Sequence, residues 1–303
     1  MSNLTTPSEL LTVGDWVRFG TSRFAHAQLH FGHGTDNAAD EAHALVMHTL
    51  GLSFSPPAYV YAAALTAAER TALGELIHRR VSERLPLPYL LGSAWFCGLE
   101  FQVDERVLIP RSPIGELIEA RFEPWAVVPP GGRVLDMCTG SGCIAIACAA
   151  WLDDVSVDAV DLDAGALAVA RANVAQHQMQ HQVRVLESDL YAALDGQRYD
   201  LIVANPPYVP SSSMAKLPAE YAHEPSFALL AADDGLQLVA TLLRDAHRHL
   251  TDDGVLLMEV GESAEAFAQR YPELPVMWCE FERGGDGVFA IDARALRDAS
   301  LNP

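Results

Sequence analysis

The sequence from about Arg133 onward alternates short apolar runs with stretches of helical periodicity, and this alternation restricts the fold more than any other feature. The runs that have the length and composition of buried strands are at residues 134–137, 155–160, 183–186 and 201–204. Residues 142–151 and 164–177 between them are expected to be helices. Strands that alternate with helices form a parallel sheet that is covered on both faces. We therefore expect an open α/β sheet.

The pattern continues toward the C-terminus and ends in a hairpin. The further elements expected are a helix at 235–250, a strand at 255–260, a helix at 263–270 and strands at 276–281 and 288–291. Gly284-Gly-Asp-Gly287 joins the last two strands and is a hairpin turn signal, so the final hairpin adds an antiparallel strand. A helix is expected to begin at Ile114, with Pro113 suited to its first turn. These elements predict one domain over residues 111–303.

Residues 1–85 have the pattern of a separate helical domain. Helices are expected at residues 8–24, 38–50 and 65–85. Asp36 or Asn37 suits the N-cap of the second helix. Thr66, with Glu69 three positions later, suits a capping box at the start of the third. We interpret this domain as the part that selects the substrate.

Residues 86–110 differ from both neighbours. Aromatic and branched residues alternate there with Gly92, Gly98 and Asp104, which is typical of a β-hairpin. We interpret these residues as a β-hairpin linker between the two domains.

Charge and cysteine content limit the partners and the compartment. The chain has 303 residues and a formal net charge of −20, from 40 acidic and 20 basic residues. Such a chain repels phosphate backbones and attracts a basic protein, although acidity that serves only solubility fits the charge equally well. The five cysteines contain no Cys-x-x-Cys pair and the N-terminus lacks a signal-peptide pattern, which predicts a cytoplasmic location. No apolar run reaches the length of a membrane span.

The stretch Asp200-Leu-Ile-Val-Ala-Asn-Pro-Pro-Tyr208 is the first candidate for a functional site. A proline cannot continue a central strand, so Asn205 lies at the carboxyl end of the strand in a loop stiffened by Pro206 and Pro207. In open α/β sheets, ligands bind outside these strand ends. The amide oxygen of Asn205 and the carbonyl of Pro206 can each accept one hydrogen of a planar N–H₂ group, while the Tyr208 ring packs on its plane. A plain Asn-Pro turn is the alternative interpretation.

The segment Asp136-Met-Cys-Thr-Gly-Ser-Gly142 is the second candidate, because it follows the first strand of the α/β pattern and opens a helix. Its glycines allow a ligand close to the backbone, but a third glycine is absent and Asp136 would repel a pyrophosphate. A cationic ligand without phosphate, such as S-adenosylmethionine, fits this carboxylate better. Asp161 ends the second strand and is placed for ribose hydroxyls. Asp189 follows the third strand and is placed for an adenine amino group, with helix caps or turns as the alternative roles.

The combination of Asp136-x-x-x-Gly140-x-Gly142, Asp161 and Asn205-Pro-Pro-Tyr208 resembles the Rossmann-like, S-adenosylmethionine-dependent methyltransferases that modify planar nitrogens. The protein glutamine methyltransferases among them are the more similar group. The segments that carry this similarity are Phe31-Gly-His-Gly-Thr-Asp-Asn37, Ala94-Trp-Phe-Cys-Gly98, Asp104-Glu-Arg-Val-Leu-Ile-Pro-Arg-Ser-Pro-Ile-Gly-Glu116, Asp136-Met-Cys-Thr-Gly-Ser-Gly-Cys-Ile-Ala-Ile-Ala147 and Gly284-Gly-Asp-Gly-Val288. The resemblance implies a seven-stranded methyltransferase domain, an N-terminal helical domain and a β-hairpin linker.

The resemblance also implies the substrate and the site residues. The branch of the family that these segments match modifies a glutamine of large-subunit ribosomal protein L-three. Peptide chain release factors are the alternative protein substrate, and adenine in nucleic acid is a weaker one. The residues implied for the amide site are Asn205, Pro206, Pro207 and Tyr208. Those expected at the cofactor are Asp136, Cys138, Thr139, Gly140, Ser141, Gly142, Asp161, Asp189, Leu190 and Asn205. Release-factor enzymes carry a tryptophan where this chain has Leu190, so contact with adenine there is apolar only.

The expected reaction is one in-line displacement at a sulfonium methyl group. The amide site must orient the nitrogen lone pair and favour the charge that develops on nitrogen, so no general base is needed before transfer. His223 is interpreted as a solvated loop histidine, with a base on a lid as the alternative. Arg111 and Glu116 are expected to form a structural ion pair. No metal site is predicted, and the oligomeric state is left open.

Overall fold

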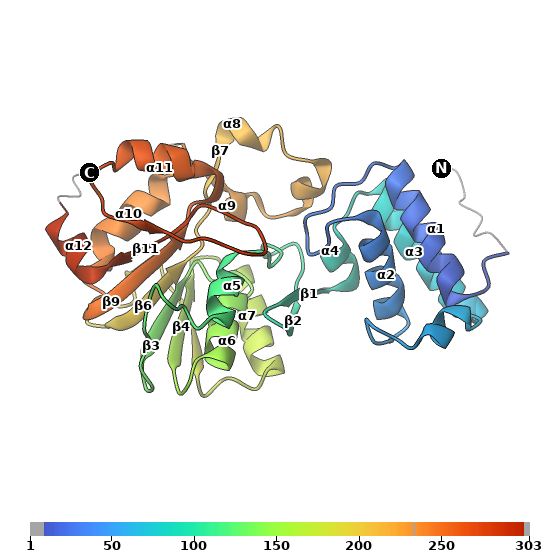
Figure 1. Cartoon of the computed structure of the whole chain (residues 1–303), viewed down its shortest axis with the longest axis horizontal. Helices are drawn as coiled ribbons and strands as arrows, with labels where there is room; N and C mark the ends of the chain where they lie inside the picture. Colours follow the sequence, from blue (N-terminus) through green and yellow to red (C-terminus); the bar gives the residue numbers. More distant parts are fainter. Residues whose placement is uncertain (1–8, 233, 300–303) are drawn as a thin grey trace. The chain divides into compact units, whose positions relative to one another are not determined.

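The computed structural model describes residues 9–232 and 234–299, which fall into two compact units. The first unit runs up to Ser93 and also contains the segment Pro218–His223. The second contains Ala94–Leu217 and the chain from Glu224 onward. The chain therefore passes from the second unit into the first and back between residues 217 and 224. Figure 1 shows the elements of both units in the order of the sequence.

Helices make up the first unit, as the sequence predicts. They are α1 (Val13–His26), α2 (Ala38–Thr49), the short 3₁₀ helix η1 (Ala58–Ala62), α3 (Ala67–Ser82), α4 (Leu87–Leu91) and the 3₁₀ helix η2 (Ala219–His223). Asn37 accepts hydrogen bonds from the backbone N–H groups of Ala39 and Asp40, and Thr66 forms a capping box with Glu69. Both predicted caps are therefore confirmed.

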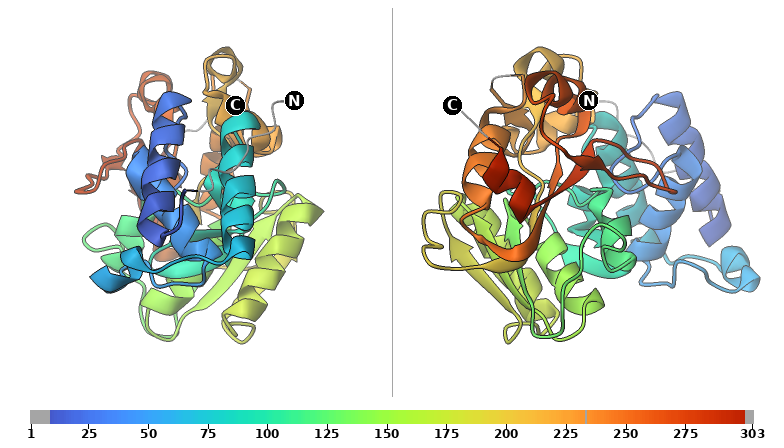
Figure 2. Two further views of the ribbon diagram at one scale, coloured as in Figure 1. Left: turned by 90° about the vertical axis from the view of Figure 1, so that its right-hand side faces the viewer. Right: turned by 60° about the vertical axis from the view of Figure 1, so that its left-hand side comes forward.

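The core of the first unit lies between α1, α2 and α3, which pack on one another (Figure 2). Trp16 and Phe24 on α1 and Leu73 on α3 are fully buried in it. Gly20 allows close packing of α1 on α2, because a Cβ at this position would lie 3.0 Å from the Cβ of Ala42. Apolar burial of this kind provides most of the stability of short helices.

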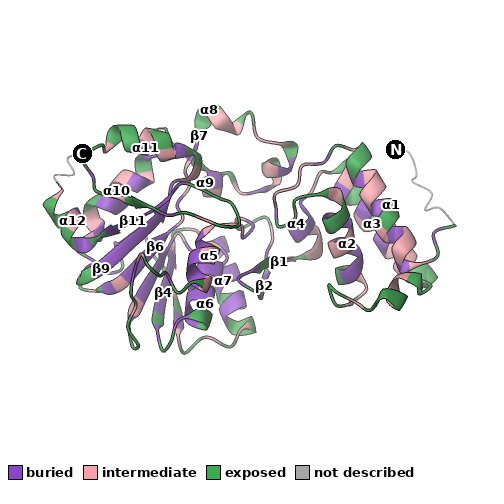
Figure 3. Ribbon diagram, viewed as in Figure 1, coloured by how far each residue is buried: buried purple, intermediate pink, exposed green. Residues whose placement is uncertain are grey.

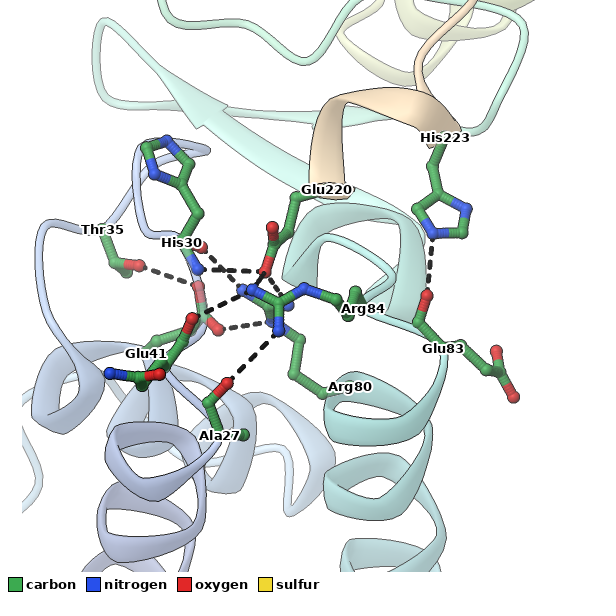
Figure 4. Close-up of polar contacts among 10 residues, drawn as sticks. Ala27, His30, Thr35, Glu41, Arg80, Glu83, Arg84, Glu220 and His223 are labelled. Carbon is green, nitrogen blue, oxygen red and sulfur yellow. Dashed lines mark hydrogen bonds and ion pairs between the residues drawn. The ribbon is translucent and has the colours of Figure 1, made fainter. Parts of the chain in front are cut away.

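A buried charge cluster ties η2 to the helices of the first unit (Figure 4). Arg80 on α3 is fully buried, and its Nε lies 2.6 Å from Oε1 of Glu41 on α2. Its Nη1 lies 3.4 Å from Oε1 of Glu220, which also accepts a hydrogen bond from the backbone N–H of His30 at 2.9 Å. Arg84 lies 3.0 Å from the same oxygen. Burial works to raise the pKa of Glu220, but these partners outweigh it and lower the pKa.

The second unit contains a seven-stranded sheet with the order β10-β11-β9-β6-β3-β4-β5. Its strands are β3 (Arg133–Met137), β4 (Ser156–Asp161), β5 (Val183–Glu187), β6 (Tyr199–Ala204), β9 (Leu250–Glu259), β10 (Met277–Trp278) and β11 (Val288–Asp292). The five strands from β9 to β5 are parallel, and β11 and β10 are antiparallel to their neighbours. The predicted α/β sheet with an antiparallel final hairpin is confirmed.

Helices cover both faces of this sheet. One face packs against α5 (Ile114–Glu119), α6 (Cys143–Trp151) and the end of α7 (Ala164–Gln176). The other packs against α10 (Gln237–Ala246), α11 (Ala264–Arg270) and α12 (Ala293–Asp298). Successive residues of β6 alternate between the two cores, with Leu201 and Val203 in one and Ile202 and Ala204 in the other. Figure 3 shows the buried strands in purple. Because both faces of the sheet are covered, the sequences of these strands are apolar at nearly every position.

The structure differs from the sequence-based expectation at four places. Residues 87–91 form α4 rather than part of a hairpin, because Pro86 and Pro88 suit a first helical turn and Gly92, with φ +71°, ends it. The hairpin itself is shorter, with β1 (Ser93–Phe96) and β2 (Leu99–Gln102) joined by Cys97 and Gly98, both with positive φ. The helix α12 was not predicted, and the right-hand view of Figure 2 shows it in red beside β9.

The fourth difference is an excursion that follows β6. It contains β7 (Val209–Pro210), α8 (Ser211–Met214), η2, α9 (Ser226–Leu229) and β8 (Leu230–Ala231). β7 pairs in parallel with β8, which closes the excursion. Elements of two to five residues leave no periodicity for sequence analysis to detect. Within the described chain, every helix is too short or too polar to cross a membrane.

Candidate active site

A cavity of about 480 Å³ lies at the carboxyl ends of the parallel strands of the second unit. Residues from the ends of β3, β4, β5 and β6 all contribute to its lining. The predicted site residues that line it are Cys138, Thr139, Gly140, Ser141, Asp161, Asp189, Leu190, Asn205 and Pro207. The remaining predicted residues, Asp136, Gly142, Pro206 and Tyr208, lie outside the lining. The strand order reverses between β3 and β6, which is where open α/β sheets bind their ligands.

The loop between β3 and α6 forms one wall of the cavity. Gly140 and Gly142 have φ values of +53° and +79°, and Gly142 is the N-cap of α6. A Cβ on Gly142 would lie 3.3 Å from the Cβ of Ala170, so this glycine also allows α6 and α7 to pack. Glycine suits both positions because their φ values are positive, and it suits position 142 also because the helices pack closely there.

Asp136 holds this loop from below. Its Oδ2 accepts hydrogen bonds from Oγ1 of Thr139 at 2.5 Å and from the backbone N–H of Ala145 at 3.0 Å. Its Oδ1 is buried, and no hydrogen-bond partner for it is found within residues 9–232 and 234–299. Burial raises the pKa of Asp136 to about 7, with Thr139 and Ala145 opposing this rise and Asp161 adding to it. Asp136 therefore acts on the cavity through the loop rather than as part of its lining.

Asp161, at the end of β4, contacts the loop between β3 and α6. Its Oδ2 accepts from the backbone N–H of Gly140 at 2.9 Å, and its Oδ1 accepts from that of Asp163 at 3.0 Å. Burial raises its pKa, although these backbone donors oppose the rise. Asp163 lines the cavity too and caps α7 through the N–H of Ala166. Two carboxylates thus lie side by side on this wall.

Asp189 and Leu190 line the cavity after β5. Leu190 has a φ of +49°, and its carbonyl accepts a hydrogen bond from Oγ of Ser188 at 2.6 Å. With Leu162, which also lines the cavity, Leu190 gives this part an apolar character. Carboxylates next to apolar side chains suit a ligand that has hydroxyl and amino groups on a flat, apolar body.

Asn205 follows β6 at the point where three strands lie abreast, since Ala204 pairs with Met137 of β3 and with Met258 of β9. Asn205 lines the cavity, and no hydrogen bond between its side chain and another residue is found in the part of the chain that the structure describes. Pro206 is buried and is not among the residues that line the cavity. Tyr208 is turned toward β9, where its hydroxyl donates to Oε1 of Glu259 at 2.8 Å.

Sequence analysis missed part of the lining. Residues 106–112 contribute, although they were interpreted as the end of the linker and the first residues of the domain that follows it. Phe227 on α9 lines the cavity while 52% of its surface stays exposed. Only the resemblance of the Ile-Pro-Arg-Ser-Pro segment pointed to residues 109–113. Phe227 gave no signal, because it is one aromatic residue in a helix of four residues.

The expected ion pair between Arg111 and Glu116 is wrong, since each side chain has another partner. Arg111 lies 2.8 Å from Oε2 of Glu224, which also accepts from the backbone N–H of Ile109 at 3.1 Å. Glu116 pairs with Arg283 at 3.3 Å. Both partners are more than a hundred residues away in the sequence, so spacing could not reveal them. His223 is in η2, where its Nε2 lies 2.9 Å from the carbonyl oxygen of Glu83, and it is not part of the cavity lining.

Comparisons with known proteins give the family. The Methyltransferase small domain matches residues 126–240, and the PrmC N-terminal domain matches residues 15–92. A ribosomal protein uL3 glutamine methyltransferase from Xanthomonas campestris pv. campestris is 50% identical over 289 residues, which are 95% of this chain and 93% of that protein. The chain belongs to the ribosomal protein uL3 glutamine methyltransferase family.

A second relative with the same name, from Xylella fastidiosa, is 47% identical over 95% of this chain and 92% of its own length. A solved methyltransferase from Pyrococcus furiosus is similar over 65% of this chain and 89% of its own, with 19% identity and a TM-score of 0.48. As a member of this methyltransferase family, the chain is an enzyme whose methyl donor is S-adenosylmethionine.

The cavity fits this donor. The sulfonium and ammonium groups of S-adenosylmethionine are cationic, and three aspartates line the cavity: Asp161, Asp163 and Asp189. The arginines of the lining are already matched by acids, because Arg106 binds Asp104 and Arg111 binds Glu224. The cavity therefore offers negative charge to a cationic ligand, and it provides no uncompensated cation for a pyrophosphate.

Proposed function

We propose that this enzyme methylates the side-chain amide nitrogen of a glutamine in ribosomal protein uL3, the large-subunit protein L-three. Two relatives that cover nearly the whole chain carry this activity in their names. The observation that carries the proposal is the position of Asn205, which lines the cavity at the switch between β3 and β6 and whose side chain forms no hydrogen bond with another residue of the described chain. A carboxamide of the substrate is the natural complement of such a group.

The residues proposed to hold the methyl donor lie on three strand ends. Backbone groups of the loop from Cys138 to Gly142 approach its amino-acid part, and Asp161 accepts its ribose hydroxyls. Asp189 and Leu190 contact the adenine, the first as an acceptor and the second as an apolar surface. The donor supplies an electrophilic methyl group on a sulfonium.

The proposed role of the Asn205 loop follows from the chemistry of an amide. A carboxamide nitrogen is a poor nucleophile, because its lone pair is delocalised into the carbonyl. The oxygen of Asn205 and the carbonyl of Pro206 accept its two N–H hydrogens, which orients the lone pair and stabilises the positive charge that develops on nitrogen. Pro207 stiffens the loop, and the Tyr208 ring fixes the plane of the amide.

We infer that the N-terminal helical domain selects the protein substrate and that the reaction takes place in the cytoplasm. The acid excess of the chain supports a basic protein substrate over nucleic acid. Mass analysis of ribosomal proteins from cells with and without this chain tests the target. We expect uL3 to lack one methyl group when the chain is absent, whereas loss of methylation from a release factor or from nucleic acid would replace the proposed substrate.

The amide site is tested with Asn205→Ala. We expect methylation of purified uL3 to fall by about 10²–10³-fold, because one group that stabilises the developing charge is lost. Calorimetry should show that affinity for S-adenosylmethionine stays within a few-fold of the parent. Gln269→Ala, at an exposed position on α11, is the matched control and should keep full activity. Near-normal turnover in Asn205→Ala contradicts the proposed role.

A further inference from the structure

Glu259 is a buried carboxylate that the proposed reaction does not use. It is the last residue of β9 and only 3% exposed. The preceding residue, Met258, pairs with Ala204, so Glu259 is adjacent to Asn205 across the strand boundary. Burying a carboxylate costs folding free energy unless hydrogen bonds satisfy it. If this position served stability alone, an apolar side chain would stabilise the fold at least as well as a buried carboxylate.

Both oxygens of this carboxylate accept hydrogen bonds from hydroxyl groups. The Tyr208 hydroxyl donates to Oε1 at 2.8 Å, and Oγ of Ser112 donates to Oε2 at 2.5 Å. Ser112 lines the cavity and also accepts from the backbone N–H of Ile114 at 3.1 Å. Glu259 thus joins the segment before α5 to the loop after β6.

Tyr208 is fixed at two further points besides its hydroxyl. Its carbonyl accepts from Oγ of Ser263 at 2.8 Å. Its ring lies directly against Gly261, where a Cβ would be 2.4 Å from the ring. The backbone and one side of the ring are therefore held by η3 (Gly261–Ser263), while the hydroxyl is held by Glu259.

We propose that Glu259 is a positioning residue for the methyl-transfer site, which sets the orientation of the Tyr208 ring and, through Ser112, the edge of the cavity beside it. The proposal rests on the proposed role of Tyr208 at the substrate amide. An ionised carboxylate accepts from both hydroxyls at once. In a glutamine, an N–H₂ donor replaces one of the two acceptor oxygens, so one hydroxyl must change from donating to accepting, and neutral hydrogen bonds replace the charge-assisted ones that fix the two side chains.

The test compares Glu259→Gln, Tyr208→Phe and the double variant. We expect each single variant to lower kcat on uL3 by about ten-fold, since a hydrogen bond to a charged group is lost. The double variant should be no worse than the poorer single one, because both act through the same bond. Affinity for S-adenosylmethionine should stay unchanged. Glu262→Gln, an exposed neighbour, is the matched control.

The outcomes separate this inference from the proposed function. A Glu259→Gln enzyme that unfolds more easily but keeps its kcat overturns the inference, and additive losses in the double variant do the same. If Glu259→Gln does not fold, Tyr208→Phe decides, because unchanged kcat in that variant shows that the hydroxyl anchor is irrelevant. Full activity of Asn205→Ala instead removes the proposed site itself, whatever Glu259 does.

Discussion

Asp136 shows how the environment of one residue changes the role that its type suggests. Sequence analysis placed it in contact with a cationic ligand, yet the structure places its carboxylate below the loop, bound to Thr139 and Ala145. Its raised pKa, about 7, follows chiefly from burial. The geometry of the loop, and through it one wall of the cavity, depends on this side chain.

This pKa gives a pH-dependent stability. The folded pKa of Asp136 is about 7 and the ordinary value is 3.8, so folded chains hold a proton that unfolded chains have released between these values. Stability from this proton is present at low pH and is lost as pH rises toward 7. We expect the unfolding free energy of the parent, relative to Asp136→Asn, to fall by up to about 4 kcal/mol from pH 4 to pH 8.

Urea unfolding of both chains without cofactor, at several pH values, measures this difference. Asparagine keeps an oxygen for Thr139 and Ala145 and does not titrate. Comparison of the two chains cancels the titration of all other groups that they share. A difference that stays constant with pH rules out a raised pKa at Asp136.

At the scale of elements, features that depend on neighbouring residues were predicted from the sequence, whereas contacts between distant residues were not. The caps of α2 and α3 were read from short patterns, because a cap hydrogen bond spans only two or three residues. The partners of Arg80 could not be predicted in this way, because Glu41 and Glu220 come from other elements. Three elements of the first unit, α2, α3 and η2, meet at this one guanidinium.

Removal of this guanidinium should be costly. We expect Arg80→Met to destabilise the chain by about 3–5 kcal/mol, because it leaves the buried carboxylate of Glu41 without its counter-charge and leaves Glu220 with Arg84 alone. Arg79→Met on the same helix is the matched control, since its ion pair with Glu83 is about half exposed and contributes at most about 1 kcal/mol. Thermal or urea unfolding measures both. Equal effects of the two substitutions refute the importance of burial here.

At the scale of the whole molecule, charge is the property that sequence defines best. The net charge of −20 acts over about 10 Å at 0.1 M salt, which is enough to steer a basic protein toward the enzyme. This effect concerns encounter with the substrate and is independent of the chemistry in the cavity.

We therefore expect the association rate with uL3 to fall steeply as salt is raised from about 50 to 300 mM, while the dissociation rate changes less. Stopped-flow measurements provide both rates. Asn205→Ala serves as a control, because it should show the same salt dependence with little methylation. Capture of uL3 at a salt-independent rate contradicts steering by charge.

The sequence alone determined the alternation of the main strands and helices, the parallel sheet and the strand ends that carry Asp161, Asp189 and Asn205. It did so because periodicity, proline and glycine act over a few residues. The tertiary structure alone decided that residues 106–112 and Phe227 line the cavity, that Arg111 pairs with Glu224, and that Glu259 holds Tyr208. Arg111 and Glu224 are 113 positions apart in the sequence, and Tyr208 and Glu259 are 51 positions apart. Only the packing of the folded chain brings such residues together.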